Sequence, residues 1–149
     1  MRVMLLSFVM FACSVSLAND TPTETEPSAV QRMAAASNAI QAKNWALAIT
    51  ELKTTVKEDP RNADAHNLLA YSYRKQSNPD LPLAFEHYRM ALKLNPNHKG
   101  AHEYIGEAYL MDNKPAEAEK HLAELKRICG NTTCEEYVDL AQAIDRYRP

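Results

Sequence analysis

The feature that most constrains this chain is an internal repeat of about 36 residues. Shifted by 36 positions, His66–Ala70 falls on His102–Gly106. Shifted by 34 positions, Ala84–Tyr88 falls on Ala118–Leu122. Self-similarity at such a period is typical of repeat proteins, in which each copy packs chiefly against its neighbours. Three copies are predicted, at residues 29–62, 63–98 and 99–130.

Apolar residues within each copy recur with the period of a helix, not with that of a strand. In the third copy, Ala118, Leu122 and Leu125 are spaced by four and three positions and therefore share one helix face. Pro60 and Pro96 follow the second helical segment of their copies and forbid its continuation. Each copy is therefore predicted to be two helices of about a dozen residues, joined by a short turn.

This pattern resembles the tetratricopeptide repeat family over about 100 residues. The resemblance is carried by small residues and tyrosines of the first helices, alanines of the second helices, one tryptophan and the closing prolines: Ala70, Gly106, Tyr73, Tyr109, Ala48, Ala84, Ala118, Trp45, Pro60 and Pro96. Three departures are visible. The first copy has Ala36 and Ala39 where the family prefers glycine and tyrosine, the second has two extra residues in its turn, and the third ends on Cys129 and Gly130 instead of proline.

The resemblance implies an all-α fold, a right-handed superhelix of three helix pairs. A repeat array needs caps, because each copy has an apolar face that only a neighbour can cover. Residues 131–149 place Tyr137, Leu140, Ile144 and Tyr147 on one face of a helix whose other face is charged. This segment is therefore predicted to be a capping helix, which makes about seven helices in all.

The first eighteen residues have the pattern of a secretory signal peptide. Arg2 precedes an uncharged run from Val3 to Val15, and small residues precede a predicted cleavage after Ala18. A lipoprotein signal acylated at Cys13 and an uncleaved anchor are the alternatives, although the apolar run is shorter than the roughly 20 residues that span a bilayer. The protein is predicted to be periplasmic or secreted, with residues 19–28 as a disordered linker.

Charge and motifs exclude several classes of function. The chain has a formal net charge of −2 and no basic stripe, which argues against nucleic acid and anionic membranes as partners. Nucleophile-elbow, phosphate-loop and HExxH motifs are absent from the sequence. Four of the five histidines occupy two repeat positions twice, so repetition accounts for them without a metal. We therefore predict a protein that is not an enzyme and has neither a cofactor nor a metal.

Cys129 and Cys134 are the cysteines that remain after removal of the signal peptide. An even pair in an oxidising compartment predicts a disulfide. Closing so short a loop contributes about 2 kcal/mol by the chain-entropy estimate. Two other readings stay open. Cys134 begins a helix and could be a redox nucleophile. A metal site would need further ligands, and the only local histidine, His121, is two turns away from Cys129.

The family resemblance also implies a binding surface, because the first helices of such repeats line a concave groove. The residues predicted to bind a ligand there are Asn67, Tyr71, Arg74, Glu103 and Glu107. The two glutamates would repel a C-terminal carboxylate, so a neutral or basic protein segment is the expected partner. An affinity near micromolar, on the order of −8 kcal/mol, is expected from three repeats.

Two further functions remain open from the sequence. One is a structural envelope protein that forms a weak homodimer through the alanine-rich first copy and an exposed Met33. The other is a periplasmic thiol–disulfide protein that uses Cys129 and Cys134.

Overall fold

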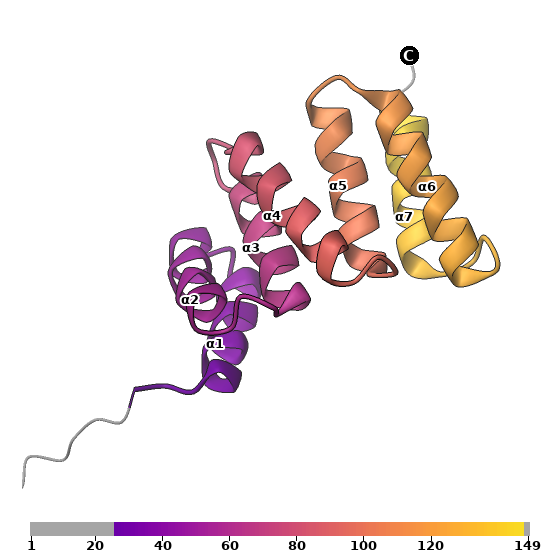
Figure 1. Ribbon diagram of the computed structural model, residues 1–149. Coiled ribbons are helices and arrows are strands. Elements are labelled where there is room, and N and C mark those ends of the chain that lie inside the picture. The colour runs from indigo at the N-terminus through magenta and orange to yellow at the C-terminus, as the bar shows by residue number, and fades with distance from the viewer. Residues whose placement is uncertain (1–25, 148–149) are drawn as a thin grey trace, which may run out of the picture.

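The computed structural model describes residues 26–147 and contains seven α-helices and no strand over that range (Figure 1). The helices are α1 (Ala29–Gln41), α2 (Trp45–Glu58), α3 (Ala63–Lys75), α4 (Leu81–Leu94), α5 (Lys99–Met111), α6 (Pro115–Cys129) and α7 (Glu135–Tyr147). The predicted signal peptide and most of the predicted linker lie outside the described residues. An all-α array of three helix pairs and a final single helix is therefore what the sequence folds into.

Side chains at the helix starts explain where the helices begin. Ser28 and Gln31 form a reciprocal capping box at the start of α1. The side chains of Asn44, Asn62 and Asp80 each accept a hydrogen bond from a free backbone N–H in the first turn of α2, α3 and α4. These caps occur at regular intervals along the chain and so divide it into hairpins.

The core is a series of three apolar clusters and not a single centre. The first lies between α1, α2 and α3, the second between α3, α4 and α5, and the third between α5, α6 and α7. Alanines at the helix crossings are fully buried, among them Ala48, Ala84 and Ala118, and their small side chains let the helices approach closely. Each hairpin therefore needs its neighbour to complete its core, as a repeat array requires.

The helices follow one another along the array, so that each one packs against the next (Figure 1). Contacts also join α3 to α5 and α5 to α7, which skip the second helix of each pair. The first helices α3 and α5 and the cap α7 therefore lie side by side. We call the surface that they share the first-helix face.

The final helix is held at the end of the array by packing and by the two cysteines. Leu140 is fully buried on Gly106, where an added Cβ would lie only 2.6 Å from a Leu140 methyl carbon. The sulfur atoms of Cys129 and Cys134 lie 2.08 Å apart, at the end of α6 and just before α7. Gly130 between them has a φ of 68°, a left-handed conformation that favours glycine. The geometry thus brings the cysteines together as the predicted disulfide requires.

Candidate functional site

The five residues predicted to bind a ligand come from α3 and α5, the two central helices of the first-helix face. Asn67, Tyr71 and Arg74 lie on α3, and Glu103 and Glu107 lie on α5. These five side chains are unequally exposed to solvent. Asn67 is 5% exposed, Arg74 5% and Glu103 7%, whereas Tyr71 and Glu107 keep part of their surface in solvent. The structure therefore separates partly exposed residues from buried ones that support them.

Arg74 is the centre of a buried network that joins α3 to α4 and α5. Its guanidinium forms an ion pair with Glu107 at 2.5 Å, and its Nε donates a hydrogen bond to the Tyr88 hydroxyl at 3.3 Å. The same guanidinium lies 5.4 Å from the ring centroid of Tyr71 and 5.7 Å from that of Tyr104. Arg74 therefore positions its neighbours, and its guanidinium is already engaged by Glu107 and Tyr88.

An aromatic row begins at Trp45, the first residue of α2, and continues onto the first-helix face beside this network. Trp45 contacts the edge of Tyr71 at 6.0 Å between ring centroids, and Tyr71 lies 4.7 Å from Tyr104. All three rings are partly exposed. Burial raises the pKa of Tyr104 to about 12, so its hydroxyl stays protonated and can donate a hydrogen bond. Aromatic residues of this kind are enriched where proteins bind other proteins.

Sequence reasoning missed Trp45 and Tyr104 as members of this surface. The family resemblance gives Trp45 only a place in the repeat pattern, and the helical period alone does not distinguish Tyr104 from a core residue. A signal for Tyr104 was nevertheless present, because it lies three positions before Glu107 and so shares its side of the helix.

Glu103 is a buried carboxyl group that the protein itself leaves unpaired. Within residues 26–147 it forms neither a hydrogen bond nor an ion pair. Burial raises its pKa to about 8, and repulsion from Glu107, Asp139 and Glu136 adds to the shift, while Arg74 opposes it weakly. The group is therefore mainly protonated at neutral pH, which is uncommon for a glutamate and typical of functional sites.

Asn67 lies against the start of α5, one turn before Glu103. Its Nδ2 would be 3.4 Å from a Cβ added to Gly100, an ordinary van der Waals distance, so the amide packs against the glycine. The Oδ1 atom of Asn67 is buried and has no hydrogen-bond partner among the described residues. An unpaired acceptor in such a place is unusual, since buried polar groups are nearly always hydrogen-bonded.

The repeated histidines form two equivalent pairs that join the helices of a hairpin. Nδ1 of His66 lies 3.0 Å from Nδ1 of His87, and Nδ1 of His102 lies 2.9 Å from Nδ1 of His121. The other ring nitrogens of His66 and His102 donate to the carbonyls of the repeat-closing prolines, because a carbonyl can only accept. In the neutral pair, the histidine of the second helix therefore donates its Nδ1–H to the first. The repetition is structural, although the sequence did not indicate that the rings touch.

These pairs predict that acid destabilises the fold. Burial, with the neighbouring His102, lowers the pKa of His121 to about 4, below the value near 6.5 of an unfolded histidine. Between these values the unfolded chain binds more protons, so stability is complete above pH 6.5 and falls as the pH drops towards 4. The His121→Phe variant should lose less free energy of unfolding than the parent over this range, by about 2 kcal/mol. Urea denaturation at pH 7, 5.5 and 4 measures this difference, and equal losses in both proteins would contradict it.

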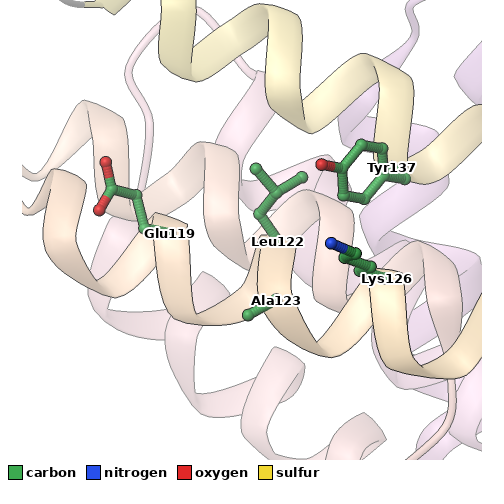
Figure 2. A pocket seen from close by; sticks show the side chains of 5 residues that line it. All are labelled: Glu119, Leu122, Ala123, Lys126 and Tyr137. Carbon is green, nitrogen blue, oxygen red and sulfur yellow. The ribbon is translucent and has the colours of Figure 1, made fainter. Parts of the chain in front are cut away.

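A shallow pocket of about 340 Å³ lies away from the aromatic row, between α6 and α7 (Figure 2). Figure 2 shows Tyr137 reaching it from α7, whereas Glu119, Leu122, Ala123 and Lys126 come from α6. None of the five predicted site residues lines it. Nothing in its lining repeats the polar features of the first-helix face, and it carries no functional assignment.

Among residues 26–147, one group of three side chains is close enough to share a metal ion, and it consists of Cys129, Cys134 and Glu136. Its two sulfur atoms lie at disulfide distance, and a disulfide offers no thiolate to a metal. Within residues 26–147, every helix is too short or too polar to cross a bilayer.

Comparisons with known proteins identify the repeat. A family model described as tetratricopeptide repeat matches residues 33–97 and 80–131. No curated protein sequence matches the chain. Among solved structures, the TPR2B-domain:pHsp70 complex of yeast Sti1 superposes with a TM-score of 0.70 at 18% identity, covering 80% of this chain and 98% of that one. The first TPR of Spaghetti (RPAP3) bound to HSP90 peptide SRMEEVD gives 0.69 at 18% identity, covering 79% and 90%. At this identity the likeness establishes the fold, and it confirms the predicted superhelix of helix pairs.

Proposed function

This chain belongs to the tetratricopeptide repeat family, and from that membership we propose that it is a non-catalytic interaction module that binds a segment of another protein along its first-helix face. The observation that carries the proposal is the partly exposed row of Trp45, Tyr71 and Tyr104. Aromatic rings bind apolar side chains and backbone with little loss of conformational entropy. The neighbouring Arg74 network holds two of these rings in place.

The charge of the face supports a neutral or basic partner segment. Glu103, Glu107, Glu136 and Asp139 lie near one another on α5 and α7, and of these Glu107 is neutralised by Arg74. The peptide in the Spaghetti structure, SRMEEVD, contains three acidic residues and one basic residue. A segment of that composition would meet like charge here, and like charges across an interface oppose binding.

We also propose that the protein acts outside the cytoplasm. The proposal rests on the signal-peptide pattern of residues 1–18 and on the paired Cys129 and Cys134 beside the cap. The self-association alternative has less support than the sequence suggested. Met33 is half-buried against the first core cluster, and Val30 is the strongly exposed apolar residue on α1.

Photo-crosslinking tests which side of the array is occupied. Lys75 is exposed at the C-terminal end of α3, with its Nζ 5.8 Å from the Tyr71 ring centroid, and Arg89 is an exposed residue of α4. Benzoylphenylalanine placed at Lys75 should crosslink to decapeptides selected on the protein from a random phage-display library. The same group at Arg89 is the matched control and should crosslink weakly. Stronger crosslinking from Arg89, or no selected peptides, would contradict the proposal.

A further inference from the structure

The first-helix face contains two hydrogen-bond acceptors that the protein does not use. One is the carboxyl group of Glu103, and the other is the Oδ1 atom of Asn67. Both residues are more than nine-tenths buried. Asn67 packs against Gly100, one helical turn before Glu103, where its Nδ2 would be 3.4 Å from an added Cβ. Buried polar groups are nearly always hydrogen-bonded, so unpaired acceptors on this face indicate donors from outside the described residues.

Among residues 26–147, no lysine or arginine donates to Glu103 or to the Oδ1 atom of Asn67. Arg74 is already bound to Glu107 and to the Tyr88 hydroxyl. Lys99, at the start of α5, has its Nζ 3.9 Å from Glu136 and is nearly half exposed. The other charged groups that act on Glu103 are the carboxylates of Glu107, Asp139 and Glu136. The surroundings of Glu103 therefore have an excess of negative charge and a shortage of donors.

The arrangement does not suit a metal ion. Among the described residues, the carboxylates of Glu103, Glu107, Glu136 and Asp139 form no group of three whose oxygens come within 4.8 Å of one another. A divalent cation would need several oxygens at about 2.0 to 2.6 Å from one point. A lysine ammonium or an arginine guanidinium carries three to five N–H donors spread over a larger volume. An organic cation therefore fits the spacing better.

We propose that Glu103 binds one cationic side chain, a lysine or arginine, of the partner segment. This inference rests on the proposed function and names the chemistry of the partner. The segment on either side of that cation would lie over Tyr71 and Tyr104, whose partly exposed rings are neighbours on the same face. The ion pair would then be enclosed, where charge-assisted hydrogen bonds are strongest.

Binding should be coupled to the release of a proton. The titratable and charged groups that act on Glu103 are Tyr71 and Arg74 on α3, Tyr104 and Glu107 on α5, and Glu136 and Asp139 on α7. Because the free carboxyl has a pKa of about 8, it must ionise to pair with a cation. Affinity should therefore rise about tenfold per pH unit below 8 and level off above it, or roughly 50-fold between pH 6 and pH 8.

Peptide selection provides the first test. Decapeptides selected at pH 8 on the parent protein should share a lysine or arginine at one position. The Glu103→Gln variant removes the charge, keeps the shape and should still select peptides, but without that preference. Glu86→Gln, on the exposed side of α4, is the matched control and should keep it. Peptides that lack a basic preference, or an unchanged preference in Glu103→Gln, would overturn the inference.

Calorimetry provides the second test with one selected lysine peptide. Titration at pH 7 in two buffers of different ionisation enthalpy should show close to one proton released per peptide bound, and none for Glu103→Gln. A twin peptide, identical except for acetyl-lysine in place of the lysine, should bind the parent protein at least tenfold more weakly. Proton release from both proteins, or equal affinity of the twin peptides, would contradict the inference. If peptides crosslink at Lys75 but fail these tests, the role of Glu103 is refuted while the proposed function stands.

Discussion

Replacing Leu140 with alanine should lower the free energy of unfolding by about 3 kcal/mol, because it removes a fully buried side chain and leaves a cavity between α5 and α7. Leu140 lies at the one point where the cap meets Gly106 of the last repeat. Urea denaturation followed by circular dichroism measures the change. Leu47→Ala is the matched control and should lose less than about 1 kcal/mol, since Leu47 is 43% exposed. Equal losses in the two variants would mean that α7 is not a cap.

A double-mutant cycle sharpens this prediction. Gly106→Ala alone should destabilise the protein by about 1–3 kcal/mol, because its new methyl group would overlap the Leu140 side chain. In the Leu140→Ala background the methyl group has room, so the same substitution should be nearly neutral. A coupling energy near zero would show that the two positions do not touch.

Replacing Arg74 with glutamine should be comparably severe, at about 3 kcal/mol. The substitution leaves the fully buried hydroxyl of Tyr88 and the partly exposed carboxylate of Glu107 without the cation that pairs with both. It also removes the cation that lies over Tyr71 and Tyr104. Arg89→Gln, at an exposed arginine of α4 that lies over Phe85, should change stability by less than about 1 kcal/mol.

The double variant Arg74→Met with Glu107→Gln distinguishes lost pairing from lost packing. If the unpaired charge is the main cause, removing both charges should recover at least half of the loss measured by urea denaturation. No recovery would show that the shape of Arg74, and not its charge, supports the aromatic row. This outcome bears on function as well, because the row carries the proposed binding surface.

Most of the fold could be predicted from the sequence because repetition makes each helix a copy of another. One aligned pair of segments, His66–Ala70 and His102–Gly106, sets the phase of α3 and α5 together. Helix starts and ends then follow from local capping and from proline, which depend on few neighbours. The cap was also predictable, because an array must cover its last apolar face.

The candidate site was predicted less completely, because the sequence does not indicate how close the helices lie to each other. The helical period indicates which side of α3 and α5 Asn67, Arg74 and Glu103 occupy, but not how near the two helices lie. Where α3 and α5 touch, long polar side chains become enclosed and pair with one another. For the same reason the histidine pairs were found only in the structure, since each joins residues about 20 positions apart.

The burial of Arg74 and Glu103 limits which substitutions can test the site. Charge reversal of Glu103 and Glu107 would test the predicted binding surface cleanly only if neither side chain supported the fold. In the structure, a lysine at position 107 would face the buried Arg74, so loss of partner binding could reflect loss of fold. Glu103→Gln avoids this problem, because a neutral amide suits the burial of that position.

A carbon-13 NMR titration of the Glu103 side-chain carboxyl, with and without a selected lysine peptide, tests directly whether this residue receives a cation. In the free protein the carboxyl should titrate near pH 8, because it is buried beside like charge and has no cation. With the peptide bound it should stay ionised down to about pH 5 or below. An ordinary glutamate pKa in the free protein, or an unchanged titration in the complex, would contradict the claim that this face is built to receive a cationic segment.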